Sequence, residues 1–76
     1  METQPMNMID LYITGKDGLP RVVYFETVRK ALSYARRAAK RSVESVRKLA
    51  WIGRDNSLHY TPLSDWYDAI AVLKVL

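Results

Sequence analysis

Apolar and polar residues alternate along residues 8–14, MIDLYIT, so that the apolar side chains fall on one side of the chain. This period of two predicts a strand with one buried face. The segment GKDGLP follows, and its Asp17-Gly18 pair is typical of a hairpin turn. The run RVVYF, residues 21–25, is β-branched and aromatic, and we expect it to be the returning strand of the hairpin.

Residues 26–41, ETVRKALSYARRAAKR, have the period of an amphipathic helix, and Thr27 is placed to cap its first turn. The apolar side of this helix is mostly alanine, which predicts close packing across the strands. The opposite side is polar, and every charged residue on it is a cation: Arg29, Lys30, Arg36, Arg37, Lys40 and Arg41.

The second half of the chain predicts another hairpin. SVESV, residues 42–46, is expected to be a transition, and KLAWIG, residues 48–53, the third strand. RDNS is then a turn, and residues 58–63 form a fourth strand that Pro62 interrupts. No internal repeat is evident in the sequence.

Residues 65–76, DWYDAIAVLKVL, are predicted to be a helix that Ser64 caps, because large apolar residues recur at i, i+4 and i+7. Asp65 and Asp68 would lie in its first turn, where negative charge suits the helix dipole. The alternative is a strand over residues 70–76, because valine, isoleucine and leucine dominate there.

These elements predict an α+β fold of order ββαββα, with an antiparallel sheet packed by the basic amphipathic helix and by a C-terminal helix. We expect one domain over residues 8–76 after a flexible tail, residues 1–7.

The chain has 76 residues, of which 49% are hydrophobic, and no cysteine. Disulfides, thiolate zinc sites and a cysteine nucleophile are therefore excluded, and the composition suits the cytoplasm. Neither a signal peptide nor a membrane span is predicted.

Charge is unevenly distributed along the chain. The formal net charge is +4, but the segment from Arg29 to Lys48 holds eight cations and only one acid, Glu44, so it carries +7 and the remainder carries −3. Cations in the first turn of a helix oppose its dipole, so this segment is not what stability alone would favour. We expect it to bind nucleic acid or an acidic nucleoprotein surface through Arg29, Lys30, Arg36, Arg37, Lys40, Arg41, Arg47 and Lys48. The alternative is that these charges only keep the protein soluble.

Candidate chemistry is sparse elsewhere. His59 is the only histidine, and no serine or carboxylate is placed by spacing to act with it, so a structural or surface role is expected. Gly15 and Gly18 fit a hairpin better than a phosphate loop. We therefore predict a protein that is not an enzyme, with no cofactor and no metal site.

A second interpretation rests on aromatic residues. Trp51, Tyr60, Trp66 and Tyr67 fall close together in the sequence, and most of them should be needed for the core of so small a domain. One or two exposed aromatics beside arginines would be typical of a protein–protein interface or a homodimer.

The run VYFETVRKALSYARRAA, within residues 21–39, resembles the strand-to-helix step of small phage-encoded inhibitors of host RNA polymerase, of several anti-CRISPR proteins and of partial-sheet antitoxins. The resemblance implies a basic inhibitor that occupies a nucleic-acid channel or an acidic protein patch. Helices of those proteins often carry acids where this chain has Arg29 and Lys30, which disfavours a DNA mimic. No functional residue of those families can be assigned to a position of this chain.

Overall fold

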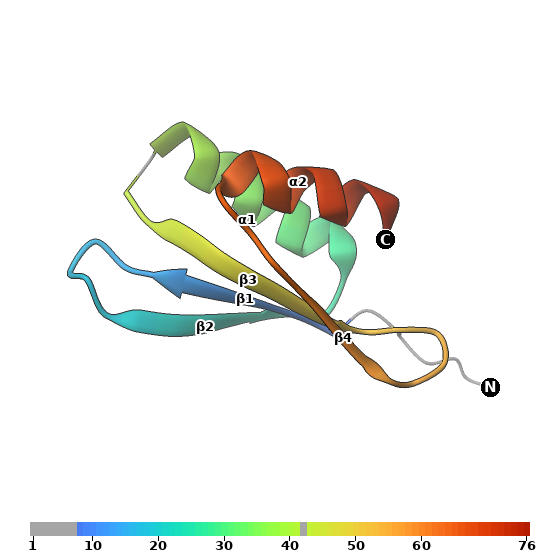
Figure 1. The fold of residues 1–76 in the computed structure, drawn as a ribbon. Coiled ribbons are helices and arrows are strands. Elements are labelled where there is room, and N and C mark those ends of the chain that lie inside the picture. Colours follow the sequence, from blue (N-terminus) through green and yellow to red (C-terminus); the bar gives the residue numbers. More distant parts are fainter. Residues whose placement is uncertain (1–7, 42) are drawn as a thin grey trace.

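The computed structural model describes residues 8–41 and 43–76, and in these ranges it contains the six predicted elements in the order ββαββα (Figure 1). They are β1 Ile9–Thr14, β2 Pro20–Phe25, α1 Val28–Arg41, β3 Ser45–Ile52, β4 Leu58–Pro62 and α2 Trp66–Val75. The α+β prediction is confirmed. The predicted tail, residues 1–7, lies outside the described residues.

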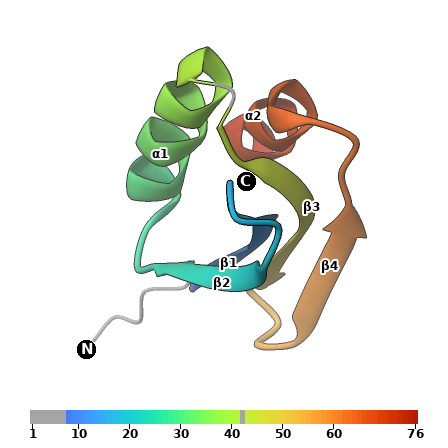
Figure 2. The ribbon, with the colours of Figure 1, turned by 90° about the vertical axis from the view of Figure 1, so that its left-hand side faces the viewer.

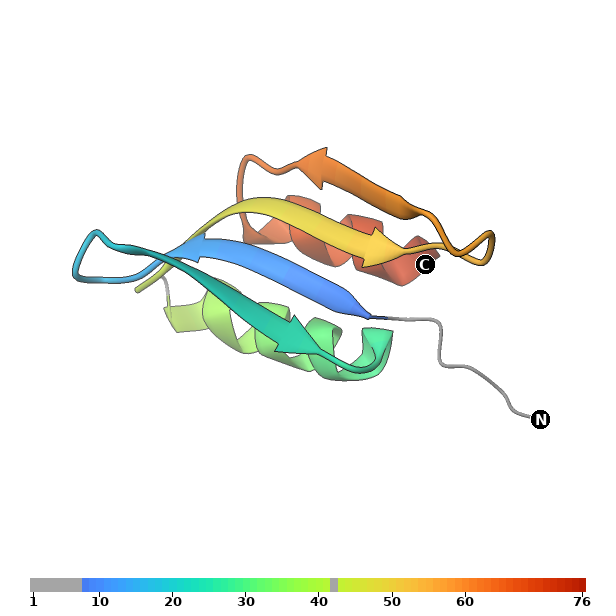
Figure 3. The ribbon, with the colours of Figure 1, turned by 90° about the horizontal axis from the view of Figure 1, so that it is seen from below.

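The four strands form one sheet in the order β2-β1-β3-β4, and all neighbouring strands are antiparallel. Both helices pack on the same face of this sheet, α1 beside α2 (Figure 2). Seen from the opposite side, the strands lie in front and the helices lie behind them (Figure 3). No element of the described chain covers this second face.

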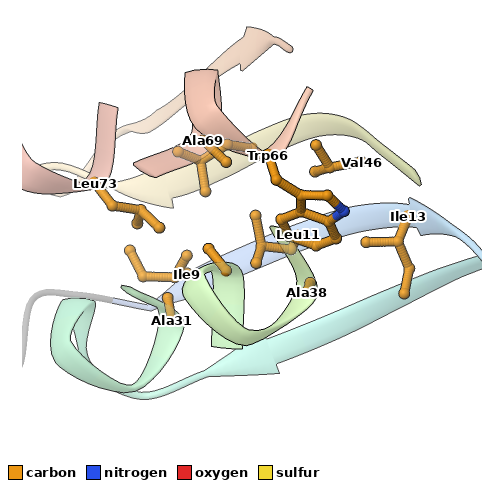
Figure 4. Close-up of a cluster of buried hydrophobic side chains, with 11 residues drawn as sticks. Ile9, Leu11, Ile13, Ala31, Ala38, Val46, Trp66, Ala69 and Leu73 are labelled. Carbon is orange, nitrogen blue, oxygen red and sulfur yellow. The ribbon is translucent and has the colours of Figure 1, made fainter. Parts of the chain in front are cut away.

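The core lies between the helices and the central strands (Figure 4). Alternate residues of β1 point into it, as the pattern predicted, and Ile9, Leu11 and Ile13 are fully or almost fully buried. The buried residues of α1 are all alanines, whose small side chains allow α1 to lie close to α2 and the sheet. Larger side chains come from α2, which contributes Trp66 and Leu73.

Three local predictions were wrong or incomplete. The predicted transition is partly strand, because a bulge between Tyr12 and Ile13 lets β3 remain paired back to Ser45. The cap of α2 is Asp65 rather than Ser64: the Asp65 carboxylate accepts from the Asp68 amide at 2.9 Å, while the Asp68 carboxylate accepts from the Ser64 amide at 3.0 Å. The alternative of a C-terminal strand is wrong, since this segment is helical.

The structure also reveals an internal repeat that the sequence analysis did not find. The unit β1-β2-α1 recurs as β3-β4-α2, and both β2 and β4, and both α1 and α2, begin 38 positions apart. Leu11 and Leu49, also 38 positions apart, are partners in the central pair of strands, so an approximate two-fold axis passes through this pair.

Both turns of the repeat have the same hydrogen bonds. In each, the first residue donates its amide across the turn at 2.9 Å, an aspartate accepts from an amide two residues later, and the fourth residue has a positive φ, 82° in one turn and 65° in the other. Glycine and asparagine are the residues that tolerate this conformation. The corresponding positions are Gly15 and Gly53, Asp17 and Asp55, and Gly18 and Asn56.

Candidate functional site

The six cations of α1 all lie on its exposed surface, on the side turned away from the alanine-rich core. We call this surface, made of Arg29, Lys30, Arg36, Arg37, Lys40 and Arg41, the basic face. Because a helix rises 1.5 Å per residue, the basic face extends over about 18 Å from Arg29 to Arg41, nearly the whole length of α1. The Thr27 hydroxyl accepts from the Lys30 amide at 3.2 Å, which confirms the predicted cap.

Charge on the basic face is largely uncompensated. Lys30 Nζ lies 3.6 Å from a carboxylate oxygen of Glu26, one residue before the predicted cap, and both side chains are well exposed. Such a pair contributes little to stability. In the described ranges, no ion pair is found for the other five cations. The first turn of α1 contains no acid, so the cations there face the positive end of the helix dipole.

The repeat provides an internal comparison for this face. Helix α2 occupies the equivalent position in the second unit and packs on the same face of the sheet, yet its exposed residues include one acid in the first turn, Asp68, and one cation, Lys74. The fold therefore accommodates a helix at this position without a row of cations. The basic face of α1 is not a requirement of the architecture.

A cavity of about 460 Å³ continues the basic face at the C-terminal end of α1. It lies between the β1–β2 turn and the last turns of the helix. Four cations line it, of which two belong to the basic face, together with two acids: Lys16, Arg21, Arg37, Arg41, Asp17 and Glu44. The excess of cations makes this cavity suited to a negatively charged group.

Glu44, the only acid between Arg29 and Lys48, lines one wall of this cavity. Its carboxylate accepts from Arg21 Nη2 at 2.6 Å and from the Tyr34 hydroxyl at 2.7 Å, and its carbonyl accepts from Trp66 Nε1 at 2.8 Å. Burial and the bond to Glu44 raise the pKa of Tyr34 to about 12. Glu44 thus links both helices to β2. Because its carboxylate is bonded to Arg21 and Tyr34, it forms no ion pair with the described cations of α1.

The structure places the last two predicted site residues away from α1. Lys48 lies on the uncovered face of the sheet, with Nζ 4.5 Å from the centre of the Tyr12 ring and 5.3 Å from that of Tyr60. Arg47 is exposed at the bulge of β3 and lines a hollow together with Lys48. Neither residue extends the basic face, because the sheet separates them from the helices.

The aromatic residues of the second interpretation are divided between core and surface. Trp66 is buried, and Trp51 is half-buried, with its ring stacked on that of His59 at 5.5 Å. Tyr60 and Tyr67 are 65% and 69% exposed, on β4 and α2 respectively. The expectation that one or two of them would be exposed is met.

The prediction that His59 has no serine or carboxylate partner was wrong. Its Nε2 atom lies 3.1 Å from Ser57 Oγ and 3.3 Å from a carboxylate oxygen of Asp55. Both partners meet the same ring nitrogen, however, and Ser57 Oγ itself donates to Asp55 at 2.8 Å. A catalytic triad needs the acid and the serine on opposite ring nitrogens. The cluster therefore fits a turn between β3 and β4 that side-chain hydrogen bonds stabilise. Sequence spacing did not predict these contacts, because the turn brings the three residues together.

This turn is expected to lose stability in acid. Hydrogen bonds from Ser57 and His59 lower the pKa of Asp55 from its ordinary value of 3.8 to about 2. The ionised carboxylate therefore stabilises the folded turn above pH 3.8, and this contribution is lost as the pH falls through about 2. We expect Asp55→Asn to be less stable than the wild type at neutral pH, and the difference in unfolding free energy to shrink near pH 2. Urea unfolding at both pH values measures it, and a difference independent of pH would contradict the assignment.

Within residues 8–41 and 43–76, no group of three or more metal-binding side chains is positioned to hold an ion. Neither α1 nor α2 has the length and apolar character needed to cross a membrane. Comparison with models of protein families, with curated proteins and with solved structures found no match. The geometry of the basic face is therefore the basis for a functional proposal.

Proposed function

We propose that this protein is a small non-enzymatic binding protein of the cytoplasm whose basic face engages nucleic acid. The observation that carries the proposal is the difference between the two helices of the repeat. They share a cap position and a position on the sheet, but one presents six cations and the other presents one. A difference that the fold does not require indicates selection for a partner.

The physical basis of the binding is counterion release. Each cation that neutralises a phosphate releases condensed counterions, which gives affinity independent of base sequence. Five cations of the basic face have no ion pair in the described chain, so they meet phosphates without first breaking an internal contact. The cavity at the end of α1 lies in line with them, and Lys16 adds a further cation there.

The expected binding is insensitive to base sequence. Reading bases needs side chains that reach the base edges or aromatic rings on which bases stack. The basic face has no exposed aromatic residue, since Tyr34, the aromatic residue of α1, is half-buried and bonded to Glu44. The resemblance to phage-encoded inhibitors supports the further proposal that such binding blocks a nucleic-acid channel of a host enzyme.

The test is the salt dependence of binding to labelled duplex DNA and to single-stranded RNA. If five cations each neutralise one phosphate, the slope of log affinity against log salt should be about −4.5 for duplex DNA, from the coefficient of −0.9 per contact. Affinity should be similar for unrelated base sequences. Absence of binding to both probes at low salt would refute the proposal, and an acidic protein surface would become the partner to seek.

A further inference from the structure

The face of the sheet opposite the helices is unusually apolar. An antiparallel sheet with one solvated face normally carries polar residues on that face. Strand alternation and register place the following apolar and aromatic residues there: Tyr12, Pro20, Val22, Tyr24, Ala50, Ile52, Leu58, Tyr60 and Pro62. We call these residues, with the polar residues among them, the open face (Figure 3). An apolar surface of this kind marks an interaction site rather than a solvated surface.

The largest side chains of the open face are those most accessible to a partner. Val22 and Tyr24 on β2 are 54% and 52% exposed, and Leu58 and Tyr60 on β4 are 64% and 65% exposed. These two edge strands flank the less exposed central strands. Two hollows of about 510 and 180 Å³ lie between the raised side chains, so the surface has both projections and recesses.

Asp10 and Lys48 lie close to the centre of the open face, and Arg47 is exposed at the bulge of β3, where it lines the larger hollow together with Lys48. Asp10 pairs with Ala50 in the register of β1 and β3, which makes Lys48 its diagonal neighbour, about 7–8 Å away. In the described chain neither side chain has an ion pair. The two rings beside Lys48, those of Tyr12 and Tyr60, hold its ammonium group over the centre of the face.

We propose that the open face binds the open face of a second copy of this chain, forming a two-fold symmetric dimer. In such a dimer the same patch of both copies forms the interface. If one residue of the first copy contacts a different residue of the second, the reverse contact is made as well. A two-fold axis that passes between Asp10 and Lys48 places each Asp10 opposite the Lys48 of the second copy. The two opposite charges at the centre of the face are then satisfied by two equivalent ion pairs, with apolar residues around them.

Charge decides between the possible occupants of this face. Asp10 and Lys48 cancel at the centre of the open face and Arg47 adds one cation at the bulge, so this face lacks the row of six cations that the basic face presents to phosphates. Low charge, tyrosines and aliphatic residues are the composition of a protein–protein interface. The opposite charges of Asp10 and Lys48, which a second copy of the same face can pair, favour a second copy over another protein.

The size of the open face predicts a weak dimer. Four strands about 4.8 Å apart and about six residues long give a projected area of roughly 19 by 20 Å. This is small beside the approximately 800 Å² per partner of a standard interface. We therefore expect a dissociation constant in the micromolar range.

Sedimentation velocity over a concentration series without nucleic acid tests the proposal separately from the proposed function. The wild type should change from monomer to dimer as its concentration rises through the micromolar range. Tyr60→Glu should shift the dissociation constant upward at least 100-fold, while Tyr67→Glu should leave it unchanged. These variants place the same charge at two tyrosines of similar exposure, one on the open face and one on α2. Leu58→Glu provides a second disruption of the open face if Tyr60→Glu does not fold.

A charge exchange tests the symmetry of the dimer. Asp10→Lys and Lys48→Asp should each weaken it about tenfold or more, because each creates two like-charge contacts. The double variant should recover most of the lost affinity. A wild type that remains monomeric at millimolar concentration would overturn the proposal, as would a dimer that Tyr67→Glu disrupts and Tyr60→Glu does not. Additive losses in the double variant would overturn the proposed axis.

Discussion

Trp66→Ala is expected to lower the melting temperature by about 20 °C or more. The indole is buried, lies against the Tyr34 ring with centroids 5.9 Å apart, and donates from Nε1 to the Glu44 carbonyl at 2.8 Å. Removing a buried aromatic side chain costs about 3–5 kcal/mol. At roughly 0.05–0.15 kcal/mol per residue, a chain of this length has only about 4–11 kcal/mol of stability. In a domain of this size each kcal/mol corresponds to about 4–8 °C.

The neighbouring residue of the same helix supplies the control. Tyr67 is 69% exposed, so Tyr67→Ala should change the unfolding free energy by no more than about 0.5 kcal/mol. Trp66→Phe keeps an aromatic ring in the core but leaves the Glu44 carbonyl without its donor, and its effect should be intermediate. Thermal unfolding followed by circular dichroism compares the three variants. Similar melting temperatures for Trp66→Ala and Tyr67→Ala would show that Trp66 does not hold the helices together.

Much of the fold follows from local patterns in the sequence. The period of two gave the first hairpin, and the period of the helix gave the face of α1 that carries the alanines. The start of β3 depends instead on a bulge opposite Tyr12, which is a property of the paired strands and has no local signal. The sequence analysis did not find the repeat because few positions carry the same residue in both units. The turn sequences GKDG and GRDN, 38 positions apart, were the signal that could have shown it.

The candidate site was predictable to the same extent. The six cations of α1 lie on one exposed face because helical periodicity alone determines it. Arg47 and Lys48 follow in sequence, but strand pairing decides on which side of the sheet a residue lies, and it places Lys48 on the open face with Tyr12. Assembly of the open face from four strands likewise required the strand order. Sequence proximity is a good guide to proximity within a helix and a poor one across a sheet.

A double charge reversal on the basic face, Arg36→Glu with Lys40→Glu, is expected to weaken nucleic-acid binding about 100-fold or more. These two residues are one helical turn apart, exposed, and without an ion pair in the described chain. Loss of two phosphate contacts should make the salt slope shallower by about 2, because each contact contributes about 1. The reversed charges add repulsion to this loss. Titration of labelled duplex DNA at several salt concentrations measures both quantities.

The control for this variant must have the same net charge, because a basic protein attracts nucleic acid weakly through its overall field. Arg54→Glu with Lys74→Glu meets this requirement: each double reversal lowers the formal net charge from +4 to 0. Arg54 lies in the β3–β4 turn and Lys74 near the end of α2; both are exposed, and neither belongs to the basic face. We expect this control to bind within a few-fold of the wild type and to keep its salt slope. Equal losses in the two double variants would mean that net charge, rather than the arrangement of cations on α1, governs binding, and the basic face would then have no specific role.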